Sequence, residues 1–595
     1  MNSIFKLYSI LTRKNKIGSI IFFLLLVFTT IFELLSIGLI FPAITILLGS
    51  DLPDKLNFIH NALENFSDYT EINYVTLGIL VLIFVFFLKN IFLLYYNWWK
   101  NGYSNEVQIQ LAQKLFLTYL RQPYTFHLQR NSSNLVRNLV NEISSVQKAF
   151  QAILELIFEV IVLMGIFTLL FITDPKSVLI VLLTLSSVVL IFYSLTYNRI
   201  KLWGNSRVVA SKKYFQNISQ AIGSLRDIIL TGRENNFLYS HYYQKKLLNK
   251  IQQKFNIITI APKFLFEFLA VFTIMSLTIF FIAEGKSYET ILPLIGLFAV
   301  AGYRLMPSVN KIIAATQSIR FRSPSINIIY KEIHIKNLND TPIDNNFFIP
   351  IEISSDQSEN YKNIFNDEIK IENLHYNYAG TKIKTLKNIN LIIKKKQSIG
   401  IFGPSGSGKS TLVSLILGLL APTAGTIKID NKELSNQLKP WQRNIGYVPQ
   451  SVYLIDDTIA QNIAFGISKN KINDRMLERA IESAQLKDFI SSLEEGLQTK
   501  VGENGVRLSG GQAQRIGIAR ALYNDPSVVV FDEATSSLDH ETEKDLMKDI
   551  NILKKEKTLI IITHRLSTVV NCDNVIKINS GEIVEQGKPE EVFKR

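Results

Sequence analysis

The chain has 595 residues, of which 47% are apolar and 19% are charged, and its 64 Lys and Arg against 50 Asp and Glu give a formal net charge of +14. This length predicts several domains, and so low a charged fraction argues against an ordinary cytosolic enzyme. Cys572 is the single cysteine, which excludes an intrachain disulfide and any cluster of cysteine metal ligands. The excess of basic residues fits nucleic acid or an anionic membrane surface, and its distribution along the chain decides between them.

Six apolar stretches in the first half of the chain are long enough to cross a membrane, which takes about 20 helical residues. They cover residues 18–48, 73–98, 148–172, 175–197, 258–283 and 288–308, and no such stretch follows residue 310. The first stretch follows several basic residues, as a signal peptide does. Because its apolar run is much longer than that of a signal peptide, we expect a retained helix.

Lys and Arg residues are concentrated in two long loops. The loop 99–146 holds five of them and the loop 198–255 holds eleven, whereas the segment 49–72 holds only Lys55. Because basic loops stay on the cytoplasmic side of a membrane, we expect both long loops and both termini in the cytoplasm. This distribution explains the net charge without nucleic acid, and no RNA- or DNA-binding signature accompanies it.

After the last apolar stretch the character of the sequence changes twice. Residues 313–368 are polar and irregular and predict a linker. From residue 369 onward, short β-rich runs at 398–402, 527–531 and 558–562 alternate with helical patterns. This alternation indicates an α/β domain with a largely parallel sheet. The predicted fold is therefore a membrane α-helical bundle over residues 1–312, then the linker, then a cytoplasmic α/β domain over residues 369–595.

The segment from Gly403 to Ser410 matches the phosphate-loop pattern G-x-x-x-x-G-K-[ST] between a predicted strand and a helical pattern. Glycines let backbone N–H groups converge on phosphate oxygens, and the helix N-terminus adds positive potential. Lys409 is expected to meet the β- and γ-phosphates, and Ser410 the Mg²⁺ ion. The candidate ATP-binding residues here are Gly403, Pro404, Ser405, Gly406, Ser407, Gly408, Lys409, Ser410 and Thr411.

A second motif, from Val528 to Glu533, is an apolar run that ends in two carboxylates. Adjacent side chains at a strand end reach different neighbours. We therefore expect Asp532 to hold the Mg²⁺ shell and Glu533 to polarise the attacking water. In isolation the same pattern fits a surface acidic pair after a core strand. Beside the phosphate loop it predicts an NTPase.

A third motif narrows the class of NTPase. Leu508-Ser-Gly-Gly-Gln512 resembles the signature of the ABC transporter superfamily. Further residues match the A-loop, Q-loop, D-loop and switch positions in the order of that family; they are Tyr378, Gln450, Asp539 and His564. The resemblance covers essentially the entire chain, in the order of an exporter half-transporter, and implies a type 1 ABC exporter fold with a P-loop nucleotide-binding domain.

The resemblance also implies roles for the matching residues. Gln450 and His564 would assist Glu533 in hydrolysis. The Mg²⁺ ligands would be Ser410, Gln450 and Asp532. In this family the signature of one domain closes on the ATP held by another, and one chain has one of each. We therefore expect a homodimer with two equivalent ATP sites. The further ATP contacts implied are Tyr378, Gln450, Ser509, Gly510, Gly511, Gln512, Asp532 and His564.

Four basic residues, Lys89, Lys263, Arg304 and Lys311, lie in or beside the predicted membrane helices. A cation at mid-bilayer costs at least about 2.5–3.5 kcal/mol on insertion scales, so such residues usually face a cavity or a partner. A cationic belt along an internal path would bind the anionic headgroup of a lipid. The alternative is that Lys263 pairs with Glu267 one turn away, while Lys89 and Lys311 reach the cytoplasmic surface.

Segments 303–312, 261–263 and 498–503 resemble the PglK family of ABC flippases, whose substrates are lipid-linked oligosaccharides of bacterial N-glycosylation. This resemblance implies an amphipathic, lipid-linked substrate that is moved from the inner to the outer leaflet of the bacterial inner membrane. Its basic positions fall on the four residues above. The alternatives are a lipid A-type flippase, an exporter of drugs or peptides, and an ATP-gated channel or regulatory binder. Glu533 and His564 argue against the last of these.

Overall fold

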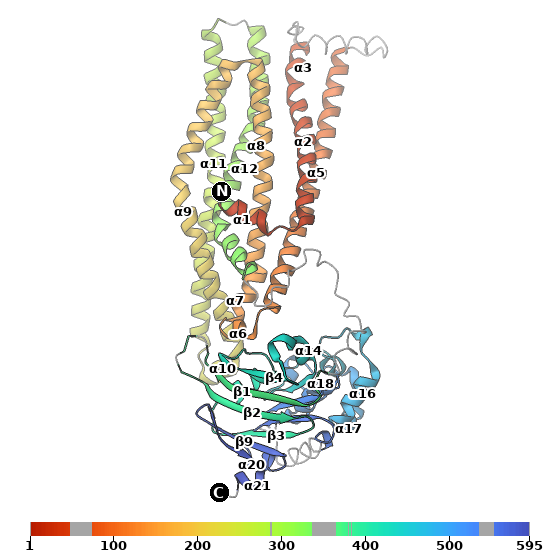
Figure 1. Ribbon diagram of the computed structural model, residues 1–595. Coiled ribbons are helices and arrows are strands. Elements are labelled where there is room, and N and C mark those ends of the chain that lie inside the picture. The colour runs from red at the N-terminus through yellow and green to blue at the C-terminus, as the bar shows by residue number, and fades with distance from the viewer. Residues whose placement is uncertain are drawn as a thin grey trace. The chain divides into compact units, whose positions relative to one another are not determined.

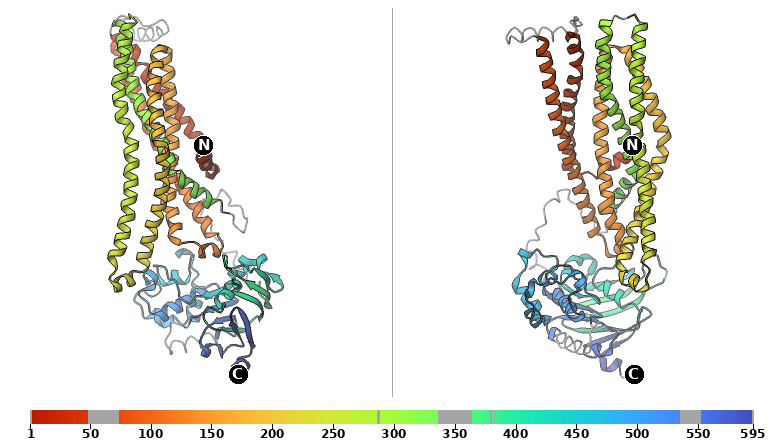
Figure 2. Two further views of the ribbon diagram at one scale, coloured as in Figure 1. Left: turned by 90° about the vertical axis from the view of Figure 1, so that its left-hand side faces the viewer. Right: turned by 180° about the vertical axis from the view of Figure 1, so that it is seen from behind.

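The computed structural model describes residues 2–47, 74–285, 288–335, 364–378, 380–381, 383–534 and 552–593. The chain divides into two compact units, Met1–Gln122 with Phe126–Phe347, and Pro123–Thr125 with Phe348–Arg595. The first unit is a bundle of long helices and the second combines strands with shorter helices (Figures 1 and 2).

Long helices dominate the first half of the chain. Five helical stretches among the described residues are long and apolar enough to cross a membrane: Asn15–Thr45, Val75–Leu120, Ser132–Ile172, Pro175–Gly223 and Glu234–Ala283. The predicted stretch 288–308 lies in a sixth long helix, α12, which is not among these five. The helices are α1 (Asn2–Ile10), α2 (Arg13–Gly38), α3 (Ile40–Leu47), α5 (Tyr74–Leu120), α6 (Tyr124–Leu128), α7 (Ser132–Arg137), the π-helical turn η2 (Asn138–Glu142), α8 (Ile143–Thr173), α9 (Pro175–Gly223), α10 (Leu225–Thr231), α11 (Glu234–Ala283) and α12 (Tyr288–Ile333).

The reversal between α8 and α9 shows how local sequence ends these helices. Asp174 takes an extended conformation, with φ −148° and ψ 94°, which stops α8. Pro175 opens α9 at a position where the missing N–H costs nothing. The Ser177 hydroxyl donates a hydrogen bond to Asp174 Oδ2 at 2.7 Å. The turn is therefore fixed by three neighbouring residues.

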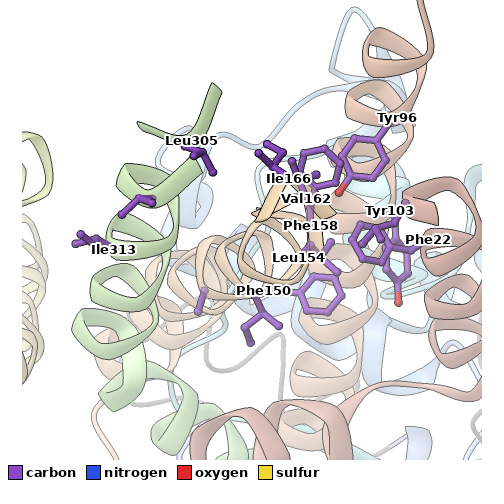
Figure 3. Close-up of a cluster of buried hydrophobic side chains, with 14 of the residues drawn as sticks. Phe22, Tyr96, Tyr103, Phe150, Leu154, Phe158, Val162, Ile166, Leu305 and Ile313 are labelled. Carbon is purple, nitrogen blue, oxygen red and sulfur yellow. The ribbon is translucent and has the colours of Figure 1, made fainter. Parts of the chain in front are cut away.

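The core of the bundle is built around one face of α8 (Figure 3). Because successive turns of a helix place every third or fourth residue on one face, apolar residues at every fourth position form a continuous stripe. Aromatic rings of α5 pack on it. Tyr96 stacks on Phe158 at 4.8 Å between ring centroids, and Tyr103 meets the ring of Phe150 edge-on at 5.4 Å. The buried stripe consists of Phe150, Leu154, Phe158, Val162 and Ile166.

Helix α12 continues past the predicted end of the membrane domain at residue 312. It runs to Ile333, so residues 313–333 are helix and not linker. Polar residues at two positions of its buried face obscured the helical period in the sequence. The rest of the predicted linker, residues 336–363, lies outside the described part of the chain. The buried face consists of Ile313, Gln317, Phe321, Ser325, Ile329 and Ile333.

Two sheets organise the second unit. The larger has the order β10-β9-β3-β8-β7-β6, in which every neighbouring pair is parallel except β10 with β9. The smaller is antiparallel, with the order β2-β1-β4-β5. The strands are β1 (Glu368–Tyr376), β2 (Leu386–Lys394), β3 (Ser398–Phe402), β4 (Ala424–Ile429), β5 (Lys432–Glu433), β6 (Ile445–Val448), β7 (Val528–Asp532), β8 (Thr558–Ile562), β9 (Asn574–Asn579) and β10 (Glu582–Gly587). The predicted α/β fold with a largely parallel sheet is confirmed.

Helices cover both faces of the larger sheet. Because side chains alternate along a strand, Val528 and Val530 of β7 face one core and Val529 and Phe531 face the other. The first core includes α13 and α14, and the second includes α15, α16 and α18. The sheet is thus buried on both sides, as parallel sheets usually are. The α-helices of this unit are α13 (Lys409–Ile416), α14 (Leu438–Arg443), α15 (Ile459–Ile463), α16 (Asp474–Ser483), α17 (Lys487–Ser491), α18 (Gly510–Leu522), α20 (Leu566–Val569) and α21 (Pro589–Val592).

Candidate functional site

Four neighbouring parallel strands end at one edge of the larger sheet. The strands β3, β8, β7 and β6 lie side by side in this order. The phosphate loop follows β3, His564 follows β8, Glu533 follows β7 and Gln450 follows β6. Ligands of such sheets bind outside the carboxyl ends of the strands. The topology therefore gathers motifs that are far apart in the sequence.

The phosphate loop, residues 403–408, joins the buried end of β3 to α13. Gly403 and Gly408 have φ angles of +149° and +107°, a region that favours glycine. A Cβ at Gly403 would lie 2.0 Å from the carbonyl oxygen of Ile578, and one at Gly408 would lie 2.7 Å from Leu386 Cδ2. Gly408 gives α13 no side-chain cap. The N-terminus of this helix is therefore available to an anion.

Lys409 folds back over the loop. Its Nζ donates hydrogen bonds to the carbonyl oxygens of Gly403 and Pro404, both at 2.9 Å, and the residue is only 6% exposed. The Ser407 hydroxyl is also buried and has no hydrogen-bond partner among the described residues. A buried ammonium group and an unpaired hydroxyl are groups that phosphate oxygens satisfy. The loop therefore fits the phosphates of a nucleoside triphosphate.

Asp532 ends β7, and its carboxylate is hydrogen-bonded to the neighbouring strand. The hydroxyl of Tyr447 in β6 donates to Asp532 Oδ2 at 3.1 Å. Burial raises the pKa of Asp532 above its usual value, and the negative charge of Glu533 acts in the same direction. The Tyr447 hydrogen bond opposes this shift because it favours the ionised form. Tyr447 thus orients Asp532 and helps to keep it charged.

Glu533 has an unusual backbone conformation, with φ 47°. Non-glycine residues rarely adopt this region, and such outliers are often found at functional sites. The side chain lies between two predicted partners. Gln450 Nε2 donates to Glu533 Oε2 at 2.7 Å, and His564 Nδ1 lies 3.6 Å from Glu533 Oε1. The structure thus brings all three predicted catalytic residues together.

Tyr378 lies beside the first turn of α13. Its hydroxyl is 3.1 Å from Thr411 Oγ1, a hydrogen bond in which either group can donate. The ring of Tyr376 meets that of Tyr378 edge-on, with 5.1 Å between centroids. The predicted A-loop tyrosine therefore lies next to the phosphate-binding segment.

The signature residues form the start of α18. The Ser509 hydroxyl accepts from the Gln512 N–H at 3.2 Å, and Gln512 Oε1 accepts from the Ser509 N–H at 2.8 Å, a complete capping box. Ser509 and Gly510 are exposed, and Gly511 and Gln512 are partly exposed. No hydrogen bond or ion pair of the described residues joins 509–512 to the phosphate loop of the same chain. The signature is preformed but does not contact this chain's own phosphate loop through such bonds.

The oxygen donors at the sheet edge suit Mg²⁺. No group of three or more His, Cys, Asp and Glu side chains is arranged as metal ligands in the part of the chain that the structure describes. In nucleotide sites, however, Mg²⁺ usually takes one or two protein ligands together with phosphate oxygens and water. The Ser410 hydroxyl and the Asp532 carboxylate are ligands of this type. Gln450 uses its amide nitrogen toward Glu533, which leaves its carbonyl oxygen as a third candidate.

A second polar site lies within the long helices. Glu159 of α8 is fully buried and pairs with two cations of α12, Lys311 Nζ at 2.7 Å and Arg304 Nη1 at 3.3 Å. The Ser308 hydroxyl donates to Glu159 Oε2 at 2.7 Å. Residues 304, 308 and 311 share one face of α12 because their spacing follows the helical repeat. This face therefore meets α8 through polar contacts.

The same site extends to α2 and α5. Arg304 Nε pairs with Glu33 of α2, and Lys89 Nζ of α5 lies 4.0 Å from the same Glu33 Oε1. On α8, Glu155 pairs with Lys311 Nζ at 3.3 Å and with Lys100 Nζ of α5 at 2.5 Å. These groups are called the charged cluster below; they are Glu33, Lys89, Lys100, Glu155, Glu159, Arg304 and Lys311.

Lys263 lies apart from the charged cluster. Its Nζ is 3.8 Å from Glu267 Oε1 one turn along α11, and both side chains are more than half exposed. Three of the four predicted substrate residues, Lys89, Arg304 and Lys311, thus lie in one network. Lys263 has the local partner that the sequence offered as an alternative.

The carboxylates of the charged cluster were not among the predicted site residues, and neither were Lys100 and Tyr447. A signal existed for Glu33, Glu155 and Glu159, because each lies inside a predicted membrane stretch where ionisable residues are rare. Tyr447 had no such signal, since an aromatic residue in a strand is ordinary.

Comparisons with known proteins agree with the geometry of the sheet edge. Residues 386–536 match the family model described as ABC transporter. Over 506 residues the chain is 28% identical to the ATP-dependent lipid A-core flippase of Ralstonia nicotianae. The aligned region covers 83% of this chain and 81% of that protein. Over 233 residues it is 45% identical to the alpha-hemolysin translocation ATP-binding protein HlyB of Escherichia coli. This aligned region covers 38% of this chain and 32% of that protein.

The architecture has a close counterpart among solved structures. A bacterial Atm1-family ABC exporter with ATP bound superposes with a TM-score of 0.77 at 22% sequence identity, over 98% of this chain and 97% of that one. The predicted type 1 ABC exporter fold is thereby confirmed. ATP hydrolysis in such a protein is coupled to transport across the membrane. The chain therefore carries an ABC transporter domain over residues 386–536.

Proposed function

We propose that a homodimer of this chain uses ATP to flip or export an anionic, lipid-linked oligosaccharide or a related glycolipid across the bacterial inner membrane. The observation that carries this proposal is the charged cluster, with Lys89, Arg304 and Lys311 among apolar helices. Cations in such a place are costly and usually have a function. The planar guanidinium of Arg304 suits phosphate oxygens, and the two lysines add point charges.

The ATP-binding half of the proposal concerns the edge of the parallel sheet. Lys409 contacts the β- and γ-phosphates, and Tyr378 lies against the nucleotide base. Ser410, Gln450 and Asp532 would hold a Mg²⁺ ion, which would supply positive charge to neutralise the transferred phosphate. The hydrogen bond from Tyr447 supports this role of Asp532, because it favours the ionised carboxylate.

In hydrolysis, Glu533 orients and polarises the attacking water. A general base must lie within hydrogen-bond reach of the proton that it takes. The contacts of Gln450 and His564 with the two oxygens of Glu533 support this role, because they restrain the carboxylate from both sides. His564 also lies at the end of β8, beside the strand that leads into the phosphate loop.

A second copy of the chain completes each ATP site in this proposal. The exposed, capped start of α18 offers Ser509 and Gly511 to the ATP of the partner. One chain holds one phosphate loop and one signature, so two chains make two equivalent sites. We propose that both termini and the loops 99–146 and 198–255 face the cytoplasm, which agrees with their basic residues.

The relatives favour a lipid over a peptide as the substrate. The similarity to a lipid A-core flippase extends over 83% of this chain and therefore includes membrane helices. The similarity to the toxin exporter HlyB covers only 38%, about the length of the nucleotide-binding domain. Substrate recognition lies in the membrane helices, so the first relative carries more weight. A lipid A-type glycolipid is the second candidate, because it is also anionic.

An apolar groove supports an amphipathic substrate. It lies between α9, α11 and α12, has a volume of about 440 Å³, and is lined by residues such as Leu277, Phe298 and Met306. Tyr303 and Leu305 also line it and flank Arg304 in the sequence. A hydrocarbon chain in this groove would lie beside α12, the helix that carries Arg304 and Lys311. Glu267, the partner of Lys263, is also part of the lining.

The test is ATP-driven movement of lipid in proteoliposomes that contain the purified protein. A labelled polyprenyl-pyrophosphate oligosaccharide should move to the other leaflet with the wild type and not with Glu533→Gln. Labelled lipid A in the same vesicles separates the second candidate from the first. Vigorous ATP hydrolysis without movement of either lipid would contradict the proposed substrate class and leave the ATPase assignment intact.

A further inference from the structure

The charged cluster contains its own counter-ions. Its four cations face three carboxylates, so its formal charge is +1 and not the +4 that the cations alone would give. Every carboxylate has at least one cation within 4.0 Å, and Arg304 and Lys311 each contact two carboxylates. The cations are Lys89, Lys100, Arg304 and Lys311, and the carboxylates are Glu33, Glu155 and Glu159.

The members of the charged cluster differ in burial. The side chains of Glu33 and Glu159 are 2% and 0% exposed, whereas that of Lys311 is 46% exposed. These two carboxylates thus lie in the interior, together with Lys89, Lys100 and Arg304, whose side chains are 10–17% exposed. Glu155 is 24% exposed, and Lys311 lies at an open edge that a ligand can reach. Glu33 Oε2 has no hydrogen-bond partner among the described residues. One oxygen of this buried carboxylate is therefore unused in the arrangement that the structure describes.

An anionic headgroup would meet this arrangement at a disadvantage. A pyrophosphate diester carries two negative charges and needs the same N–H donors that Glu33 and Glu159 occupy on Arg304 and Lys311. With the carboxylates in place, its entry would turn a cluster of +1 into one of −1. Like charges at close range are strongly unfavourable where water is excluded. Carboxylate and headgroup therefore compete for one set of cations.

We propose that Glu33, Glu155 and Glu159 occupy the anion site in the absence of substrate, and that the anionic headgroup must displace them to bind. This inference rests on the proposed function and adds its regulation. The ion pairs connect α12 to α2 and α8, through Arg304 with Glu33 and through Lys311 with Glu159. Displacement breaks these connections. Substrate binding then releases the helices that have to move in transport.

The experiment measures binding of radiolabelled geranylgeranyl pyrophosphate to the purified full-length protein in detergent. All samples carry Lys409→Ala, so that the phosphate loop does not capture the pyrophosphate. Glu159→Gln keeps the shape of the side chain and removes one competing charge. We expect its dissociation constant to fall at least about tenfold below that of the Lys409→Ala parent, as the loss of a close like charge implies.

Two further variants sharpen the measurement. Glu332→Gln is the matched control, because Glu332 is also a part-buried carboxylate paired with an arginine, Arg130 at 2.7 Å, but lies outside the charged cluster. Its dissociation constant should not change. If Glu159→Gln fails to fold, Glu155→Gln decides the question. The side chain of Glu155 is 24% exposed, and its removal should tighten binding by a smaller factor.

The outcomes separate the inference from the proposed function. If the Lys409→Ala parent binds the probe, and Glu159→Gln and Glu155→Gln bind it with the same or lower affinity, the inference alone is overturned. A purely structural carboxylate predicts no gain in affinity. Binding seen only after removal of carboxylates would support it strongly. No binding by any variant, including one with Glu33, Glu155 and Glu159 all changed to Gln, would overturn both. Equal binding of neutral geranylgeraniol would contradict the anionic substrate and, with it, the competition.

Discussion

The carboxylates of the nucleotide site and those of the charged cluster have opposite surroundings. Glu533 contacts Gln450 and His564 and has no lysine or arginine partner among the described residues. Glu159 is completely buried and paired with two cations, Arg304 and Lys311. A carboxylate that acts on water must stay available, whereas one that holds helices together must be neutralised. Under the two proposals above, Glu533 is free to act on water, whereas the ion pairs of Glu159 have to be rearranged before an anion binds.

We expect the largest loss of activity from a substitution of Glu533, which tests whether its carboxylate acts on water. Glu533→Gln keeps an amide oxygen that can accept from Gln450 but cannot take a proton. We expect ATP hydrolysis to fall at least about 100-fold, the usual contribution of a general base, while ATP binding is retained. Phosphate release and equilibrium ATP binding of the purified protein measure the two properties. Glu585→Gln, in a pair with Lys577, is the matched control. Near-normal turnover of Glu533→Gln would remove it from the reaction.

A substitution of Arg304 tests whether the cations of the charged cluster stabilise the fold by neutralising its buried carboxylates. Arg304→Gln leaves Glu33 and Glu159 buried with fewer cations. Removing one partner of a buried ion pair typically costs about 3–5 kcal/mol, so the unfolding midpoint should fall by several degrees. Lys263→Gln removes only an exposed pair with Glu267, which is worth at most about 0.5 kcal/mol. Thermal unfolding in detergent compares the two variants. Equal losses of stability would show that Arg304 is no more integrated into the fold than Lys263.

The smallest effect concerns Tyr447. Loss of its hydrogen bond in Tyr447→Phe should raise the pKa of Asp532 further above its usual value. A carboxylate has to be ionised to hold Mg²⁺. The Mg²⁺ concentration for half-maximal ATPase should therefore rise about fivefold, the equivalent of one hydrogen bond, and the acidic limb of the pH profile should move to higher pH.

The control for Tyr447 is another tyrosine of the same unit. Tyr523 is buried, and its hydroxyl accepts from the Asn473 N–H at 2.9 Å, away from the sheet edge. Tyr523→Phe should change stability without changing the Mg²⁺ dependence or the pH profile. If both variants shift the Mg²⁺ dependence equally, Tyr447 does not act through Asp532.

Most of the nucleotide-binding unit could be predicted from the sequence, because its signals are local. The predicted runs 398–402 and 558–562 coincide with β3 and β8. The phosphate loop and the pair at the end of β7 are contiguous motifs, and strand order alone brings them together. The Tyr447 contact with Asp532 was not predictable, since it depends on which strand lies next to β7.

Less of the charged cluster could be predicted, because its contacts join residues far apart in the sequence. Arg304 and Glu33 lie 271 positions apart, and no periodicity links them. Lys263 with Glu267 was found because the two are one turn apart. The helical segment 313–333 was missed for another reason, since Gln317 and Ser325 on its buried face hide the apolar stripe.

The proposed function requires that the protein recognises the anionic linkage of its lipid. The most direct measurement uses the unmodified protein in proteoliposomes with two labelled lipids that share one polyprenyl chain and one glycan. One lipid carries a pyrophosphate linkage and the other a neutral ether linkage. We predict ATP-dependent movement of the pyrophosphate lipid and little or none of the neutral lipid. Movement of both lipids at the same rate would contradict recognition of the anionic linkage.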